Sequence, residues 1–270
     1  MKTLHAWLLV SGPLAAGSVA LPAQAETVDC TPVTSLPATI DSQGIYCLTG
    51  NLATSQTSGY AITITANNVT LDLNGWKVGG QAAGTDTNAF GIFSTATNVT
   101  VKNGIVRGFS FGIRLMGRGA VVRDMLVDQN TRFGIYVEGQ GAVVEHNQVV
   151  DTGGSTTSTV VGIIATGVGS TVSNNTVSGV TAVGSNGEWG ISVNGANSTV
   201  RDNVVSDEVK PTGAASYGLY QTQSIAVNNT VSNFVYGIYT TISGGIYAHN
   251  TVYNCTTPYS GGTAGAGNSP

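Results

Sequence analysis

Charged side chains are scarce in this sequence, in which Asp, Glu, Lys and Arg together make up 9% of 270 residues. Histidine and cysteine number three each and show no metal-ligand spacing, which excludes a structural zinc site. Long apolar runs are also missing beyond the N-terminal residues, because Gly, Asn or Thr interrupts each of them, and this excludes a later membrane span. So little charge would leave a helical protein poorly soluble, and it indicates outer surfaces covered by hydroxyl and amide groups.

Glycine and asparagine are abundant instead, with 37 and 21 residues, and they recur in a repeated frame. The clearest copy is VGIIATGVGSTVSNNTVSGV at residues 161–180, which contains a Gly-Ile pair, a turn, a strand and an Asn. The first glycine of the frame recurs, in steps of 21, 22, 28, 28, 28 and 19 residues, at Gly91, Gly112, Gly134, Gly162, Gly190, Gly218 and Gly237. Short β-branched strands repeated in this way are typical of a solenoid.

Three columns emerge when the copies are aligned on this glycine. The first is apolar and holds Ile92, Ile113, Ile135, Ile163, Ile191, Leu219 and Ile238. The second is apolar and holds Val106, Val127, Val149, Val177, Val205, Val231 and Val252. A polar column between them holds Asn147, Asn175, Asn203, Asn229 and Asn250, with Gly104 and Met125 at its two earliest positions. Stacked copies can bury the apolar columns as ladders, and the Asn amides can bond to backbone at a buried bend.

The repeat, its Gly-Ile opening and the V-x-x-N-x-V frame resemble the right-handed parallel β-helix family, which includes pectate-lyase-like enzymes. The resemblance covers about residues 61–255. It implies an all-β fold, a right-handed parallel β-helix solenoid of about eight coils with an N-terminal cap. A resemblance of this kind is specific for the fold and carries little information about function.

We expect four segments: a signal peptide at 1–25, an N-terminal cap at 26–60, the β-helix at 61–258 and a flexible tail at 259–270. The first segment combines Lys2, an apolar run and the small-residue site Ala23-Gln24-Ala25, which indicates a secreted or periplasmic protein. Cleavage after Ala25 would remove one of the 10 basic residues, leaving nine against 14 acidic residues and a net charge of −5. The glycine-rich tail has no side chains to bury.

Export makes disulfides possible for the three cysteines. Cys30 and Cys47 flank a short segment with a turn at Ser42-Gln43-Gly44, so we predict that they are bonded and staple the cap. Cys255 lies in the last coil, and its pairing stays open. The alternative is that all three cysteines are buried thiols.

The segments that join the Val column to the next Gly-Ile strand vary in length. Four are long, at residues 79–89, 153–160, 181–188 and 207–216, and two are short, at 108–110 and 129–132. All should project along one edge of the rod, where insertions often mark the binding face. The short segments should then form a dip between longer walls.

Basic residues concentrate around the short segments, at Lys102, Arg107, Arg114, Arg118, Arg123 and Arg132. Only Asp124 and Asp128 oppose these six within the stretch, which therefore carries +4 (six minus two) on an acidic chain. We predict a basic groove over Lys102–Arg132 that binds an acidic polysaccharide, and we expect no nucleic-acid partner. The alternative is an ordinary solvated face.

Equivalent positions in successive coils should be stacked neighbours. Lys102, Arg123 and Glu145 then form one outward column, and Arg114 and Tyr136 belong to another. Arginines can pair with carboxylates, and aromatic faces can pack on sugar rings. We therefore assign substrate binding to Arg107, Arg114, Arg132, Tyr136 and Glu145.

The family resemblance also implies a reaction, because lyases on this fold remove a proton next to a uronate carboxylate, commonly with Lys or Arg as the base. Lys102 and Arg123, from neighbouring coils, are the predicted catalytic pair of such a polysaccharide lyase acting by β-elimination. We expect no cofactor: a calcium site would need stacked carboxylates, and only Asp124 and Glu145 lie near the pair. The alternative is a non-catalytic scaffold, adhesin-like or structural, in which both are plain solvent-facing residues.

Overall fold

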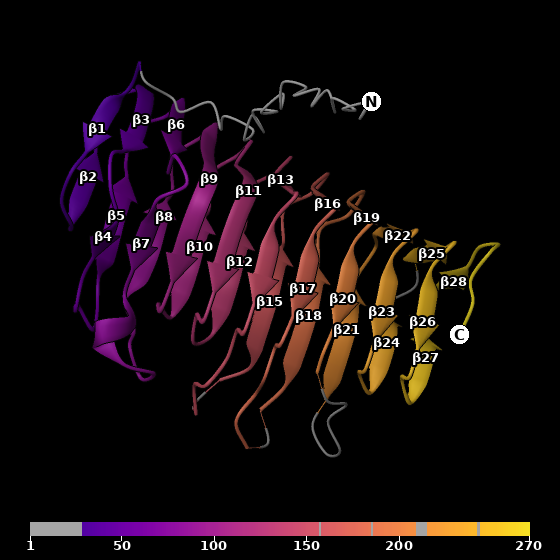
Figure 1. Ribbon diagram of the computed structural model, residues 1–270. Coiled ribbons are helices and arrows are strands. Elements are labelled where there is room, and N and C mark those ends of the chain that lie inside the picture. The colour runs from indigo at the N-terminus through magenta and orange to yellow at the C-terminus, as the bar shows by residue number, and fades with distance from the viewer. Residues whose placement is uncertain (1–28, 157, 185, 209–214, 242–243) are drawn as a thin grey trace, which may run out of the picture.

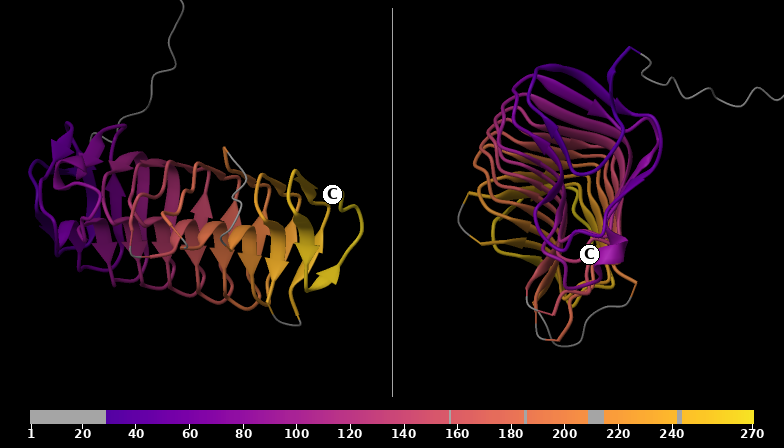
Figure 2. Two further views of the ribbon diagram at one scale, coloured as in Figure 1. Left: turned by 90° about the horizontal axis from the view of Figure 1, so that it is seen from below. Right: turned by 90° about the vertical axis from the view of Figure 1, so that its left-hand side faces the viewer.

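The computed structural model describes residues 29–156, 158–184, 186–208, 215–241 and 244–270, so the expected signal peptide at 1–25 lies outside the described residues. The chain winds into a parallel β-helix of about nine turns, which forms a straight rod (Figure 1) with the coils stacked around one core (Figure 2). The only helix in the described ranges is the short 3-10 turn η1 (Gln81–Ala83). The all-β parallel fold predicted from the repeat is confirmed, with about one turn more than expected.

One side of the rod is a ten-stranded parallel sheet that carries the Gly-Ile pairs. Its strands are β2 (Ala38–Ile40), β5 (Tyr60–Ile64), β8 (Phe90–Ser94), β10 (Phe111–Leu115), β12 (Phe133–Val137), β15 (Val160–Ala165), β18 (Glu188–Val193), β21 (Ser216–Gln221), β24 (Tyr236–Thr240) and β27 (Thr257–Ser260). Equivalent residues of successive coils are paired, for example Ile113 with Ile135 and Ile135 with Ile163.

An 18-stranded sheet forms the other two sides and folds sharply at the Asn column. Before the fold, on what we call the pre-Asn face, lie β1 (Thr31–Val33), β3 (Gly44–Leu48), β6 (Val69–Asp72), β13 (Val143–Glu145), β16 (Thr171–Ser173), β19 (Thr199–Arg201), β22 (Ile225–Val227), β25 (Ile246–Ala248) and β28 (Thr263–Ala264). After it, on the post-Asn face, lie β4 (Leu52–Ala53), β7 (Lys77–Gly79), β14 (Gln148–Val150), β17 (Thr176–Ser178), β20 (Val204–Ser206), β23 (Thr230–Ser232) and β26 (Thr251–Tyr253). The longer strands β9 (Val99–Arg107) and β11 (Val121–Asp128) contribute to both faces.

Both predicted apolar columns lie inside the rod, where no member of the Ile or Val column is more than 2% exposed. The alternation of side chains along each strand sends the neighbouring residues outward. The glycine before each Ile is needed because the chain passes close to other backbone. A Cβ atom on Gly134 would lie 2.6 Å from the carbonyl oxygen of Gly162 and 2.6 Å from Cγ1 of Val149.

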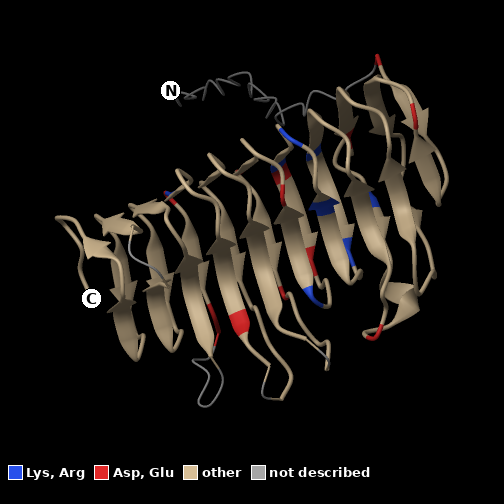
Figure 3. Cartoon of the chain, turned by 180° about the vertical axis from the view of Figure 1, so that it is seen from behind, with Lys and Arg blue, Asp and Glu red and all other residues tan. Residues whose placement is uncertain are grey.

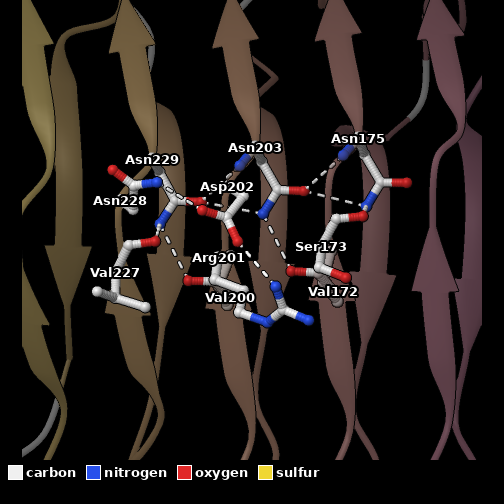
Figure 4. Close-up of polar contacts among 10 residues, drawn as sticks. All are labelled: Val172, Ser173, Asn175, Val200, Arg201, Asp202, Asn203, Val227, Asn228 and Asn229. Carbon is white, nitrogen blue, oxygen red and sulfur yellow. Dashed lines mark hydrogen bonds and ion pairs between the residues drawn. The ribbon is translucent and has the colours of Figure 1, made fainter.

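The Asn column forms a continuous ladder of buried amides at the fold of the 18-stranded sheet (Figure 4). The Oδ1 atom of Asn203 accepts hydrogen bonds from the backbone N–H and the Nδ2 atom of Asn175, at 2.9 and 3.0 Å. Its Nδ2 atom donates to the carbonyl of Val172 and to Oδ1 of Asn229, both at 3.0 Å. Each amide thus satisfies backbone groups of the preceding coil that the fold removes from the sheet ladder.

The residue before each position of the Asn column forms the sharp bend of the backbone. These residues have φ between 55° and 58° and are Asn103, Asp124, His146, Asn174, Asp202, Asn228 and His249. Asn, Asp and His are the residue types other than glycine that most often adopt this left-handed conformation. The two histidines on this column, His146 and His249, are therefore bend residues.

The two ends of the rod depart from the segments expected for them. Residues 31–53 pair with the first coil through β2, β3 and β4, as a further coil would. The predicted disulfide between Cys30 and Cys47 is present in this part. Residues 259–270, expected as a flexible tail, instead continue the solenoid, because β28 pairs with β25 and Asn268 accepts two hydrogen bonds from Asn250. The amino-acid composition of the tail gives no sign of this pairing, because the pairing uses backbone groups and one Asn side chain.

The ladder predicts a large stability effect from a small side-chain change. Asn203→Ala should lower the free energy of unfolding by about 2–4 kcal/mol, because it leaves the buried N–H of Asn175 and the carbonyl of Val172 without a bonding partner. Chemical denaturation of the purified protein measures this. The matched control is Asn194→Ala, an exposed amide outside the ladder, which should cost no more than about 0.5 kcal/mol. Equal losses in the two variants would contradict a ladder that stabilises the fold.

Candidate functional site

Aromatic side chains form two rows on the outer side of the ten-stranded sheet. One row precedes the Gly-Ile pairs and contains Tyr60, Phe90, Phe111, Phe133, Trp189, Tyr217 and Tyr236, and the other follows them and contains Phe93, Tyr136, Tyr220 and Tyr239. Neighbouring rings stack on one another, with centroids 4.5 Å apart for Phe90 and Phe111 and 4.6 Å apart for Trp189 and Tyr220. Several ring faces are covered by neighbouring rings in this way, which limits the faces available for the sugar packing that we expected.

Two arginines lie among the rings of β10 and β12. We call Phe111, Arg114, Arg132, Phe133, Tyr136 and Glu138 the arginine–aromatic cluster. The Cζ atom of Arg114 lies 5.2 Å from the ring centroid of Phe111 and 5.1 Å from that of Tyr136. The Cζ atom of Arg132 lies 5.6 Å from the centroid of Phe111 and 5.2 Å from that of Phe133. Both guanidinium groups are therefore held on the sheet surface by cation–π contacts.

Glu138 contacts both Arg114 and Tyr136, which are paired neighbours on β10 and β12. Its Oε1 atom lies 2.8 Å from Nη2 of Arg114, and its carboxylate also accepts a hydrogen bond from the hydroxyl of Tyr136. Burial and the neighbouring Glu138 carboxylate raise the pKa of Tyr136 above its usual value, so this hydroxyl keeps its proton at neutral pH. Glu138 is a member of the cluster that the sequence did not single out. Its position two residues after Tyr136, directly after the end of β12, was the available signal, because residues two apart on an extended chain share a face.

Arg132 has no acidic partner comparable to the Glu138 carboxylate that pairs with Arg114. No ion pair joins it to a carboxylate of the described residues, and its Nε atom is buried without a hydrogen-bond partner there. Burial lowers the pKa of its guanidinium below the usual value, which means that the surroundings disfavour the charge. A ligand carboxylate bound to the guanidinium of Arg132 would supply the opposite charge.

The predicted catalytic pair lies on another side of the rod, the pre-Asn face. Lys102 and Arg123 are stacked neighbours there, and Glu145 follows in the next coil, as expected. Each cation has an acidic partner: Nζ of Lys102 lies 2.7 Å from Oδ2 of Asp72, and Nη1 of Arg123 lies 2.9 Å from Oδ2 of Asp124. Asp72 is only 1% exposed, so Lys102 neutralises a buried charge. Aligning V-T-L-D at 69–72 with V-T-V-K at 99–102 would have shown this contact.

The basic residues of the expected groove lie on all three sides of the coil, and a single groove over Lys102–Arg132 is not formed (Figure 3). Arg114, Arg132 and Tyr136 lie together on the ten-stranded sheet, Lys102, Arg123 and Glu145 on the pre-Asn face, and Arg107 on the post-Asn face. Three of the five predicted substrate-binding residues are thus brought together, and two are separated from them. The stretch spans more than one full coil, so residues close in sequence point in different directions.

A hollow of about 330 Å³ lies where the dip between the long junctions was expected, lined in part by Gln81, Thr85, Gly108, Gln129, Thr131 and Asp151. Its lining contains a carboxylate and no Lys or Arg, so it is not a basic groove. In the part of the chain that the structure describes, no three His, Cys, Asp or Glu side chains are placed to hold a metal ion. The same residues include no helix with the length and apolarity needed to cross a membrane.

Comparison with known proteins supports the fold. No protein-family model and no curated protein matches the sequence. The structure is similar to the Dettilon tailspike protein gp208, with a TM-score of 0.65 and 16% identity over 87% of this chain and 51% of that one. It is also similar to the periplasmic alginate epimerase AlgG (TM-score 0.51, 11% identity, 86% and 76% covered) and to an alginate lyase from Paenibacillus sp. str. FPU-7 (0.50, 12%, 84% and 99%). The chain spans about half of the tailspike, and such identities establish a shared fold alone.

The ion pairs on the pre-Asn face predict different stability effects for its two cations. Lys102→Ala should lower the free energy of unfolding by about 3 kcal/mol, because it removes the ammonium from the buried Asp72 carboxylate. Arg123→Ala should cost no more than about 0.5 kcal/mol, because the Arg123 side chain is 41% exposed. Thermal or chemical unfolding distinguishes the two. An unchanged transition in Lys102→Ala would mean that Lys102 does not stabilise the fold.

Proposed function

We propose that this chain is an extracytoplasmic β-helix protein that binds an acidic polysaccharide on the outer side of β10 and β12. The observation that carries the proposal is Arg132, a half-buried cation without a carboxylate partner among the described residues, beside Arg114 on the same surface. The cluster has two arginines and one glutamate, so its charge attracts anions. A disulfide is typical of proteins in oxidising compartments, which agrees with the secreted or periplasmic location indicated by residues 1–25.

The ligand chemistry follows from the two kinds of group in the cluster. A uronate unit carries a carboxylate that an arginine can bind through two parallel hydrogen bonds, and its ring can lie against aromatic edges. Because the rod repeats about every 4.8 Å, an extended polymer can follow its surface over several coils. Two of the structures with a similar fold are named for alginate, an acidic polysaccharide, which agrees with this ligand class.

The proposal predicts salt-sensitive binding that depends on two arginines. Titration calorimetry with alginate oligosaccharides should show saturable binding that weakens as salt is raised, because exposed charges are screened. Arg114→Ala and Arg132→Ala should each weaken it about tenfold or more, since a hydrogen bond to a charged group contributes about 1.5–3 kcal/mol. The matched control is Arg201→Ala, which removes the same charge from the pre-Asn face and should leave affinity within about twofold. Equal losses in all three variants would reduce the effect to net charge and contradict a specific site.

Cleavage of the polymer by Lys102 and Arg123 remains a prediction. In β-elimination a base takes the proton next to the carboxylate, a double bond forms in the ring, and the glycosidic oxygen leaves. Arg123 is the cleaner test of the pair, because removing it keeps the contact between Lys102 and Asp72. If the pair is catalytic, Arg123→Ala should abolish the ultraviolet absorbance of the unsaturated product while polymer binding persists. Product formation by Arg123→Ala at the wild-type rate would exclude Arg123, and no product from the wild type would exclude the lyase.

A further inference from the structure

The hollow at the junction edge is separate from the arginine–aromatic cluster. Residues 79–89 form one wall, with Thr85 in the lining, and Gly153 lies on the opposite wall. The floor comes from the short junctions between them, through Gly108, Gln129 and Thr131. Its volume of about 330 Å³ falls at the small end of the range typical of small-molecule sites.

Hydrogen bonds hold the polar groups of the floor in place. Gln81, Arg107 and Gln129 form one hydrogen-bonded group, in which the Gln81 and Gln129 amides lie 2.6 Å apart and Nη2 of Arg107 lies 2.6 Å from the Gln129 amide. Nη2 of Arg107 also lies 3.1 Å from Oδ2 of Asp128, which orients the guanidinium from the other side. Two amides that line the hollow are therefore held in place by hydrogen bonds.

The backbone of the floor has a conformation that its side chains do not favour. Gln129 and Asp151 have φ of 51° each, in a bend where other coils place Gly108, Gly179, Asn233 or Asn254. Glutamine is an unfavourable residue for this conformation, and residues in such conformations concentrate at ligand sites. Gln129 is the member of this bend with the least suitable side chain, and it lines the hollow.

A buried hydroxyl adds an independent sign of a ligand. Thr131 lines the hollow and is 4% exposed, and its Oγ1 atom has no hydrogen-bond partner in the described part of the chain. Buried polar atoms are nearly always bonded, so an exception needs an explanation. A ligand hydroxyl in the hollow would provide one.

The charges around the hollow disfavour an anionic ligand and a metal ion. Arg107 and Asp128 neutralise each other, and Asp151 in the lining repels anions. A metal cation would need several carboxylates, and no such group is found among the described residues. Amides, a carboxylate and hydroxyls are the groups that bind alcohol hydroxyls, which can donate and accept hydrogen bonds.

We propose that this hollow binds one neutral sugar unit, held by the amides of Gln81 and Gln129, the carboxylate of Asp151 and the hydroxyl of Thr131. The site goes beyond the proposed binding of an acidic polymer and does not depend on it, because it lies at a different edge and needs no ligand charge. It would bind a neutral branch, a neutral unit within a mixed polymer, or a chain end.

The test is a titration of the full chain with neutral sugars, followed through backbone amide NMR shifts. The probes are glucose, galactose, mannose and rhamnose, together with lactose and cellobiose. At least one should bind saturably in the millimolar range, with the largest shifts at residues 81–85, 129–131 and 151–153. Gln129→Gly and Asp151→Asn should each weaken that binding about tenfold, the loss expected from a hydrogen bond of about 1.4 kcal/mol. Glycine favours the bend conformation, so Gln129→Gly should fold.

Two controls separate this proposal from its alternatives. Asn233→Gly makes the same kind of backbone change in the same bend, away from the hollow, and should bind the probe as the wild type does. Arg114→Ala should also leave neutral-sugar binding unchanged, so failure here is distinguishable from failure of the acidic-polymer site. The proposal is overturned if no probe binds up to the solubility limit, or if Gln129→Gly binds as tightly as the wild type.

Discussion

Each coil of this protein must fold its backbone sharply where two faces of the 18-stranded sheet meet, and the fold leaves backbone groups inside the rod. The buried amide ladder satisfies them, because each Asn bonds to the coil before it and the coil after it. A ladder of this kind requires the same amide at the same place in successive coils. It therefore fixes the register of the stacked strands, and with it the position of every outward side chain.

Because core, bend and ladder use a fixed set of positions, function is left to the outer columns and the junctions. On the ten-stranded sheet, outward positions of β10 and β12 bring Arg114 and Tyr136 together, Glu138 joins them directly after β12, and the short junction before β12 adds Arg132. That same junction contributes Gln129 and Thr131 to the hollow. Two surfaces with different chemistry, one cationic and aromatic and one with amides, hydroxyls and a carboxylate, are thus built from four consecutive residues and their neighbours.

The sequence was sufficient for the fold, because strand pairing, buried columns and ladder all repeat with the glycine of the Gly-Ile pair. It was insufficient for the site where a contact depends on a single residue. Asp72 stands in an outward column but is buried beside Lys102, and Glu138 binds Arg114 from the next coil. The expected groove combined residues 102–132 by their charge and the short junctions, and the bends distribute them over three sides. The tail was misjudged because backbone pairing and one amide, that of Asn268, have no compositional signature.

We infer that an acidic polymer binds on the outer side of β10 and β12, and a crystal structure of the protein with a bound uronate oligosaccharide would show this. The sugar chain should lie across these strands, with a carboxylate within hydrogen-bond distance of the guanidinium of Arg132 and a second sugar unit near Arg114. An oligosaccharide bound instead over Lys102 and Arg123 on the pre-Asn face, with Arg132 untouched, would contradict it.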